Sequence, residues 1–209
     1  MDVIQALKWR YAVKQFDPTK KLTSMQVNRL LEGLCLTATS MGMQLMEFLV
    51  VSKPDLKMQI SPIAYNQPQI TDCSHLIIMC RKSTVNQEDI NELVDITASK
   101  RNVDINNLKG FKQMLDSTLQ MNPAQQSRWM ENQVYIAMGN LMTICAVEQV
   151  DACPMEGFNT TDLDALLELK EKGLNSVLLC PVGYRSKKDK YNGLRKVRRD
   201  KNKMIRFLD

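Results

Sequence analysis

The chain has little of the residue on which much protein-based catalysis depends. It contains one histidine, His75, in 209 residues, so a histidine metal site, a Ser–His triad or a Cys–His dyad would have to use it. His75 precedes the apolar run of residues 76–80, where a hydrogen-bonded structural role is the simpler interpretation. If the chain is an enzyme, we therefore expect a cofactor to carry the chemistry.

Glycine is also scarce, with eight residues that never occur two apart. This spacing excludes the G-x-G-x-x-G turn of dinucleotide-binding βαβ units, and no Walker A pattern is present. A phosphate would then have to be held by side chains, with Arg as a fork and Lys as a point charge.

The six cysteines are scattered, and no pair has the spacing of a zinc or thioredoxin motif. We expect no metal site, and buried free thiols rather than a disulfide framework, as in a reducing cytoplasm. The sequence has no run of about 18 uncharged apolar residues and no signal-like start. We therefore expect a cytoplasmic protein with no membrane partner.

The positive charge is concentrated at one end. The formal net charge is +5, but residues 185–209 hold eleven Lys or Arg and three Asp, a balance of +8. Such a tail can bind nucleic acid. Its aromatic residues are few (Tyr184 at its start, Tyr191 and Phe207), so we favour a solvated segment with some cations turned toward a phosphate, and expect no nucleic-acid partner.

Apolar periodicity indicates one α+β domain over residues 1–209, a sheet flanked by helices. The polar helical stretch 87–121 is interpreted as an excursion or lid. A long helix at 124–149 is apolar nearly all round, which favours a homodimer. We further expect strands at 48–51, 76–80 and 175–184, a loop at 66–69, and helices at 2–9, from Thr23, at 55–64, and around Leu163 up to Gly173.

Two pairs of cations lie near opposite ends of the chain. In an extended segment, Arg10 and Lys14 project to the same side, with small Ala12 between them. Lys196 and Arg198 share a side in the same way. Each pair alone also fits a solvated strand, but the two together suit a shared anionic ligand.

Seven segments, in order, resemble the FMN-dependent nitroreductase family. The first is Arg10-Tyr11-Ala12-Val13-Lys14-Gln15-Phe16-Asp17, which matches the family's Arg-x-Ser-x-Lys-x-Phe-Asp except at Ala12. Another is Pro154-Met155-Glu156-Gly157-Phe158, a Pro-x-Glu-Gly-Phe match. The others are residues 20–23, 66–69, 129–135, 170–173 and 181–183.

The resemblance implies a nitroreductase-like α+β fold with a central mixed sheet, in an intertwined homodimer that binds FMN. By analogy, the cations hold the phosphate and the polar edge of the flavin, Pro154 and Met155 cover the ring, and Glu156 and Gly157 lie against N5. The residues expected to bind the cofactor are Arg10, Tyr11, Ala12, Lys14, Thr39, Ser40, Gln44, Asn66, Gln69, Pro154, Met155, Glu156, Gly157, Lys196 and Arg198.

Three departures from the family pattern bear on the pocket. Close relatives carry Lys where this chain has Gln69, which removes a positive charge. The segment 38–46 lacks the family's Pro-Trp pair. Met114 and Leu115 stand where relatives often carry aromatic residues over the ring, so we expect an apolar, flexible lid.

The implied activity is hydride transfer from NAD(P)H through flavin N5 to a quinone, nitroaromatic or similar small acceptor, by ping-pong kinetics. No protein nucleophile or general base is required. The alternative is an FMN-binding or flavin-modifying member without NAD(P)H-driven nitroreduction.

Overall fold

The computed structural model describes residues 2–208, and its centre is a four-stranded sheet in the order β1-β2-β4-β3. The strands are β1 (Met46–Val51), β2 (His75–Lys82), β3 (Asp151–Ala152) and β4 (Leu174–Gly183). All three pairings are antiparallel. The mixed sheet expected from the resemblance is thus corrected: among the described residues, parallel pairing is confined to the isolated bridge between Ala12 and Ala152.

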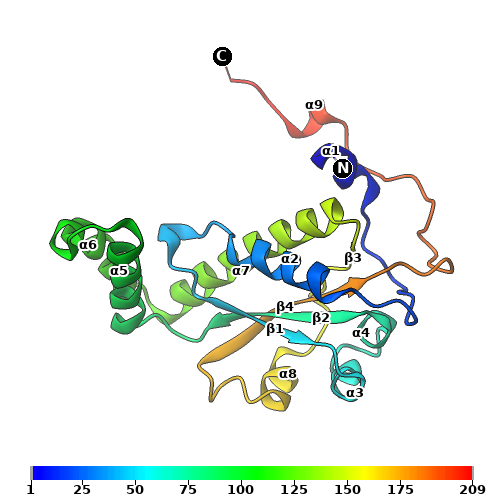
Figure 1. Cartoon of the computed structure of the whole chain (residues 1–209), viewed down its shortest axis with the longest axis horizontal. Coiled ribbons are helices and arrows are strands. Elements are labelled where there is room, and N and C mark those ends of the chain that lie inside the picture. Colours follow the sequence, from blue (N-terminus) through cyan, green and yellow to red (C-terminus); the bar gives the residue numbers. More distant parts are fainter. Residues whose placement is uncertain (1, 209) are drawn as a thin grey trace.

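The sheet is covered on both faces, because β2 alternates its side chains between two apolar clusters. Leu76 and Ile78 belong to one cluster, and Ile77 and Met79 to the other. The helices α3 (Pro54–Ile63), α4 (Pro68–Asp72) and α8 (Thr160–Leu166) cover the first face, and α2 (Ser24–Cys35) and α7 (Pro123–Val147) the second (Figure 1). The central strand therefore reads as an unbroken apolar run.

A bulge changes the alternation along β4. Met79 pairs with Leu178 and Cys80 with Ser176, so Val177 is the extra residue. After this point, Leu178 faces the α7 side and Leu179 the α8 side. The bulge thus lets β4 keep an apolar residue on each face through its second half.

The long helix α7 begins and packs as its sequence predicts. Asn122 caps it in a capping box with Gln125, and Pro123 occupies the first turn. Gly33 of α2 allows the close approach of these two helices, because a Cβ there would lie 2.2 Å from Cδ1 of Ile144. The capping box of Thr23 and Gln26 that opens α2 is also present.

Residues 87–120 form a separate helical lobe, at the far end of the molecule from the termini in Figure 1. It consists of α5 (Gln87–Arg101), η2 (Ile105–Leu108), α6 (Lys109–Asp116) and η3 (Ser117–Gln120). Ile90 and Leu115 of the lobe belong to an apolar cluster that also includes Met130 of α7. The helices expected in this stretch are present, and their apolar side chains pack together with residues 43 and 45 and with α7; a role as a lid stays a prediction.

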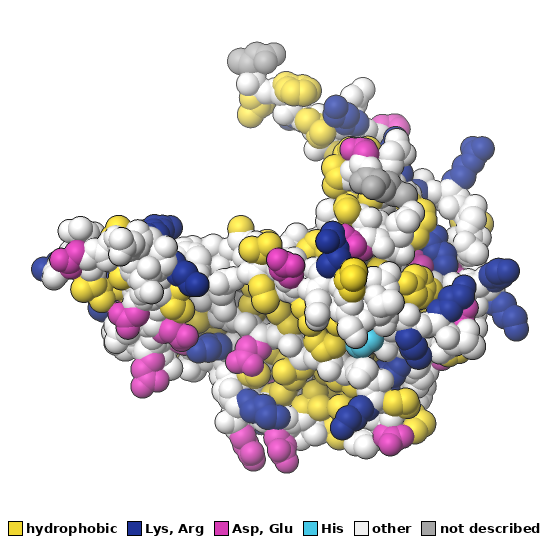
Figure 2. All heavy atoms as spheres, viewed as in Figure 1, with side chains coloured by type: hydrophobic (Ala, Val, Ile, Leu, Met, Phe, Trp, Pro, Cys, Tyr) yellow, Lys and Arg dark blue, Asp and Glu magenta, His cyan; other side chains and the backbone are white. Residues whose placement is uncertain are grey.

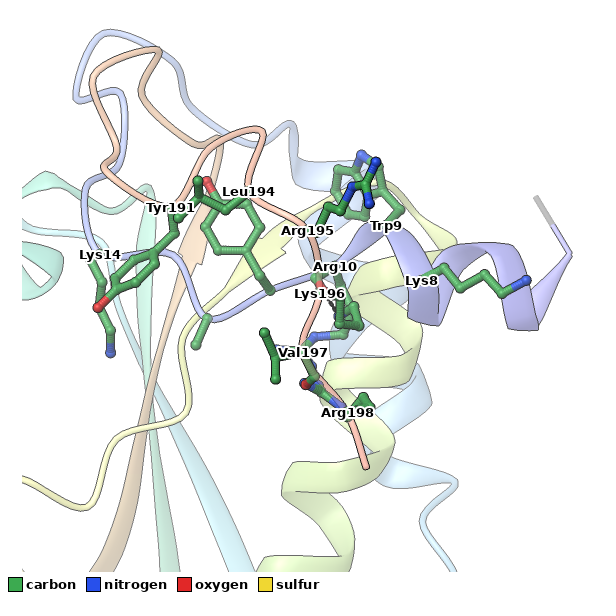
Figure 3. Close-up of a pocket in the computed structure, with 12 residues that line it drawn as sticks. Lys8, Trp9, Arg10, Lys14, Tyr191, Leu194, Arg195, Lys196, Val197 and Arg198 are labelled. Carbon is green, nitrogen blue, oxygen red and sulfur yellow. Dashed lines mark hydrogen bonds between the residues drawn. The ribbon is translucent and has the colours of Figure 1, made fainter. Parts of the chain in front are cut away.

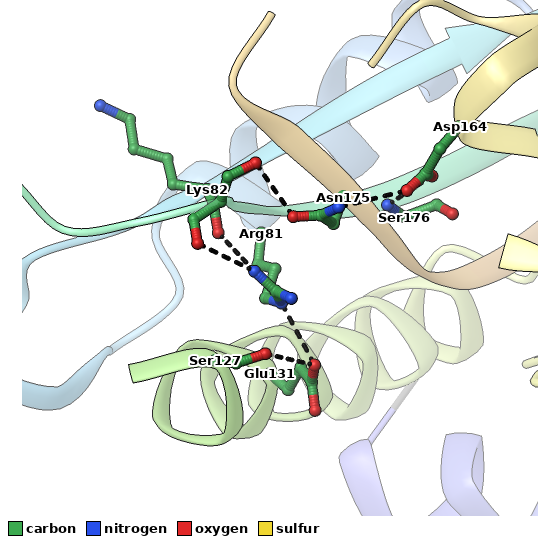
Figure 4. Close-up of polar contacts among 8 residues, drawn as sticks. Arg81, Lys82, Ser127, Glu131, Asp164, Asn175 and Ser176 are labelled. Atoms are coloured by element: carbon green, nitrogen blue, oxygen red, sulfur yellow. Dashed lines mark hydrogen bonds and ion pairs between the residues drawn. The ribbon is translucent and has the colours of Figure 1, made fainter. Parts of the chain in front are cut away.

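A polar network joins β2 to its neighbours near this lobe (Figure 4). Nε of Arg81 lies 3.1 Å from Oε1 of Glu131 on α7, and the same carboxylate oxygen accepts from Ser127. On the other face, the buried Asp164 accepts from the backbone N–H of Ser176 at 2.9 Å. These contacts fix α7 and α8 against the ends of the central strands.

Two expected elements end differently. The loop at 66–69 is a loop only to Gln67, because α4 starts at Pro68. The helix around Leu163 stops at Leu166, and turns carry the chain to Gly173.

The basic segment after β4 first forms turns at residues 187–193 and then runs as an extended chain with one short helix, α9 (Lys201–Met204). It passes α1 (Val3–Trp9) and ends beyond it (Figure 1), and Lys and Arg side chains gather on that side of the molecule (Figure 2). The tail carries exposed apolar residues, including Val197 and Phe207. The sequence patterns did not indicate α4, α9 or the two-residue strand β3. The other predicted strands and helices are present, with ends shifted by a few residues.

Candidate functional site

The segment after α1 is held in an extended form along the edge of the sheet. Arg10 ends the helix with φ −71° and ψ 146°. The bridge between Ala12 and Ala152 attaches the segment to β3, and the bridge between Phe16 and Arg185 attaches it to the chain that follows β4. The alternation predicted for residues 10–16 is therefore confirmed as extended backbone, although it forms bridges rather than a full strand.

A buried carboxylate fastens the tail to this segment. Oδ2 of Asp189 accepts from the backbone N–H groups of Lys14 at 2.6 Å and Gln15 at 2.7 Å, and Oδ1 accepts from Tyr191 at 2.8 Å. Asp189 is 4% exposed. The bonds from Lys14 and Gln15 fix the two distant segments side by side, which no local pattern in the sequence indicated.

Between the two segments lies a cavity of about 500 Å³. Six of its twelve lining residues are Lys or Arg and none is acidic. Figure 3 shows Arg10, Lys196 and Arg198 gathered together, with Lys14 across the cavity beside Tyr191. The structure thus brings together around one cavity the four cations identified from the sequence, Arg10, Lys14, Lys196 and Arg198.

The cations in this cluster repel one another. Burial, followed by the nearby Arg198, lowers the pKa of Arg10. Burial and the charges of Arg10 and Arg198 lower the pKa of Lys196, whose Nζ donates to the backbone oxygen of Arg10. An anion bound among these side chains would relieve this repulsion.

A second cavity of about 490 Å³ continues from the first, with Lys14 and Tyr191 in both walls. Gln69 lines it and is itself 3% exposed. Nζ of Lys14 lies 3.6 Å from Sγ of Cys153. Asn66 is exposed, in the left-handed conformation at φ 53°, and is not among the lining residues of either cavity.

The segment after β3 contains the Glu-Gly turn. Backbone hydrogen bonds of 2.9 and 3.0 Å between Met155 and Leu179 fix the turn to β4. Glu156 and Gly157 are exposed. Met155 is 5% exposed and packs in the core, whereas Pro154 is half-buried; their place over a flavin ring stays a prediction.

Two residues that support this turn were missed. Nε2 of Gln67 donates to the carbonyl of Gly157 at 2.8 Å and to that of Ala64 at 3.1 Å. The hydroxyl of Tyr135, on α7, donates to Oε1 of Glu156 at 2.8 Å. Both residues stood inside family-like segments, but only the fold places them at the turn.

Comparison with known proteins identifies the family of this chain. A family model described as the nitroreductase family matches residues 7–184. The chain belongs to the nitroreductase family. An oxygen-insensitive NAD(P)H nitroreductase of Salmonella typhimurium is 30% identical over 211 residues, which cover 95% of each chain.

Solved structures agree with this assignment at the level of fold. A nitroreductase-like protein from Streptococcus mutans matches with a TM-score of 0.86 and 19% identity, covering 100% of this chain and 98% of that one. A structure described as a nitroreductase in complex with FMN, from Exiguobacterium sibiricum, matches with a TM-score of 0.84, 18% identity and the same coverage. The nitroreductase fold expected from the sequence is confirmed.

Residues 38–46, which by the nitroreductase resemblance reach the cofactor of the second subunit, lie away from the basic cavity of their own chain. The N–H of Ser40, in η1 (Ser40–Gly42), donates to Oε1 of Gln133 in the first half of α7, and Thr39 Oγ1 accepts from Gln44 N at 3.1 Å. Nε2 of Gln44 donates to the carbonyl of Cys35. None of the three lines the basic cavity, so within one nitroreductase chain the structure does not bring them to the cations.

The two lid residues separate. Met114 is 46% exposed, whereas Leu115 is fully buried in the cluster of the helical lobe. The structure thus leaves Met114 available to a ligand and buries Leu115, and the lid role of both residues stays a prediction.

The other reactive side chains of this nitroreductase, His75 and the six cysteines, are in surroundings typical of structural residues. Nδ1 of His75 lies 2.9 Å from Ser74 Oγ, and burial lowers the pKa of the ring, as suits a hydrogen-bonded neutral histidine. All six cysteines are free thiols, five of them buried. Over residues 2–208, no group of three or more His, Cys, Asp or Glu is arranged to hold a metal, and no helix is both long and apolar enough to cross a membrane.

Proposed function

We propose that this nitroreductase is an FMN-dependent oxidoreductase that uses NAD(P)H as reductant. The observation that carries the proposal is the cavity with six cations and no acid, formed by the family's Arg-x-x-x-Lys segment and the Lys196–Arg198 tail. A phosphate needs such side chains because the chain has no glycine-rich loop to hold one.

The chain's own residues fit this cofactor. Arg10, Lys196 and Arg198 would neutralise the phosphate, while Lys14 and Gln69 in the adjoining cavity would meet the polar edge of the flavin. Tyr11 and Ala12 line the first cavity between these groups. Asn66, which lines neither cavity, would contact the ribityl chain or the pyrimidine side of the flavin.

Bound FMN supplies the redox step, since a flavin accepts hydride from a nicotinamide and passes it to a second acceptor. Glu156 and Gly157 would fix the reactive edge, with Gln67 and Tyr135 holding that turn in place. We propose a quinone, a nitroaromatic or a similar small molecule as acceptor, with ping-pong kinetics and Met114 as the lid residue.

The active form is proposed to be a homodimer. The exposed face of α7 presents Tyr135 and Ile136, which are 47% and 50% exposed, and α1 exposes Val3, Ile4 and Leu7. A second copy would cover these side chains and carry Thr39, Ser40 and Gln44 to the partner's cofactor. We further propose a cytoplasmic location.

An absorbance spectrum before and after anaerobic NADPH or NADH tests the proposal. Purified protein should be yellow and lose its flavin absorbance on reduction, and regain it when a quinone is added. Bound flavin that neither nucleotide bleaches would instead support a flavin-binding or flavin-modifying role. A colourless protein that takes up no FMN would reject both.

A further inference from the structure

Arg185, the second residue after β4, lies behind the wall of the basic cavity. Its Cζ is 4.2 Å from the centre of the Trp9 ring and 4.5 Å from that of the Tyr11 ring. Trp9 and Tyr11 line the cavity, whereas Arg185 does not. Its guanidinium thus contacts two rings of the wall without lining the cavity itself.

The position of Arg185 is fixed by a buried acid. Asp151, on β3, is 4% exposed and accepts from the backbone N–H of Arg185 at 2.7 Å and from Nε at 2.8 Å. Nη2 also lies 2.5 Å from Oδ1, as an ion pair without hydrogen-bond geometry. With its charge paired to Asp151, Arg185 is not itself an anion ligand.

The two rings flank Arg10 in the sequence. Trp9 is the last residue of α1, whereas Arg10 is extended, so Tyr11 projects to the opposite side from Arg10. A guanidinium that attracts both Trp9 and Tyr11 therefore holds them on one side and directs Arg10 to the other, toward Lys196 and Arg198. The Tyr11 hydroxyl is buried without a hydrogen-bond partner, so its contact with Arg185 is through the ring.

We propose that Arg185 is a positioning residue for the phosphate site: with Asp151 as anchor, it holds Trp9 and Tyr11 so that Arg10 faces the anion. The proposal rests on the proposed FMN function. Orienting Arg10 before the ligand arrives saves the cost of ordering a long side chain on binding, so affinity for the phosphate depends on a residue that does not touch it.

Flavin titrations of the full-length chain, freed of cofactor, test this role. The probes are FMN and riboflavin, which differ only by the phosphate. Arg185→Lys keeps the charge next to Asp151 but loses the planar group over the rings. We expect it to weaken FMN binding about tenfold, with the affinity for riboflavin changed less than twofold. Lys100→Met removes a charge from an exposed position on α5, far from this cavity, and should change neither.

Trp9→Leu provides a second route, because it removes a ring while leaving the Arg185–Asp151 pair intact, and it should reproduce the FMN-selective loss. In an Arg10→Ala background, Arg185→Lys should cause no further weakening. Equal losses for both flavins, or an undiminished loss without Arg10, would overturn the proposal and indicate a general packing role. If wild type binds FMN and the variants bind it equally well, this inference alone is rejected. If wild type binds no flavin, the proposed function is rejected as well.

Discussion

The hydroxyl of Tyr135 donates a 2.8 Å hydrogen bond to Oε1 of Glu156, joining the middle of α7 to the Glu-Gly turn after β3. This bond is the main cause that raises the pKa of Tyr135. The two residues are 21 apart in sequence, and both are exposed. In the proposed function, the bond holds the turn that contacts the reactive edge of the flavin.

Changing Tyr135 to Phe should therefore slow reduction of bound FMN by NAD(P)H about two- to tenfold, the usual worth of one hydrogen bond, with FMN affinity unchanged. Stopped-flow bleaching measures the rate. Thr143→Ala is the control, since that hydroxyl bonds only to the Gly139 carbonyl within α7. Equal rates for wild type and Tyr135→Phe would mean that the contact does not support the turn.

Lys14→Ala and Arg198→Ala should each give folded protein with little flavin. Each change removes a charge-assisted contact worth about 1.5–3 kcal/mol, or roughly ten- to hundredfold in affinity. Flavin content and a binding titration check this. Lys100→Ala, on an exposed lysine of α5 that lines neither cavity, is the matched control and should bind as wild type does. Full occupancy of both variants at micromolar protein would assign these cations to the surface.

The affinity for FMN should fall at alkaline pH as Lys196 loses its proton. Burial and neighbouring cations lower its pKa in the free protein, and a bound phosphate would raise it. The contribution of Lys196 is then fully present below the pKa of the free protein and is lost as pH rises through that of the complex. Titrations from pH 7 to about 10 should show this loss in wild type and a later one in Lys196→Arg. Identical profiles would exclude Lys196 as the titrating group.

Gly157, and not His75, should matter for turnover. A Cβ at Gly157 would lie 3.3 Å from Nε2 of Gln67, which bonds to the carbonyl of the same glycine, so Gly157→Val should displace the turn and slow flavin reduction. His75→Ala should change turnover by well under the hundredfold typical of losing a general acid or base, with ping-pong kinetics retained. A collapse in the histidine variant alone would contradict this assignment.

Light scattering should give a mass of about twice the 23.9 kDa of one chain. The reason is the apolar face of α7, since a monomer would leave Tyr135 and Ile136 half-exposed to water. Ile136→Glu should weaken the assembly and lower FMN occupancy with it. A stable 24 kDa species with bound FMN would overturn the dimer.

The sequence by itself determined most of the helices and strands and the cations of the proposed anion site. An unbroken apolar run at 76–80, the capping box of Thr23 with Gln26, and Pro123 before a long apolar stretch are local signals, and each led to the observed strand or helix. The cations of the two terminal segments were identified the same way, since Arg and Lys at alternate positions of extended chain share a side.

Only the tertiary structure decided which residues support that site and which pack away from it. The sequence suggested Leu115 and Met155 as ligand contacts, but both side chains are buried in the structure. Burial of an apolar side chain depends on its tertiary neighbours, which a local sequence pattern does not identify. Asp189 and Arg185 gave no signal, since their partners, Lys14 and Trp9, lie more than 170 residues away. Periodicity indicates the face of a strand or helix on which a side chain lies. Which residues that side chain contacts depends on the path of β4 and the tail through the fold.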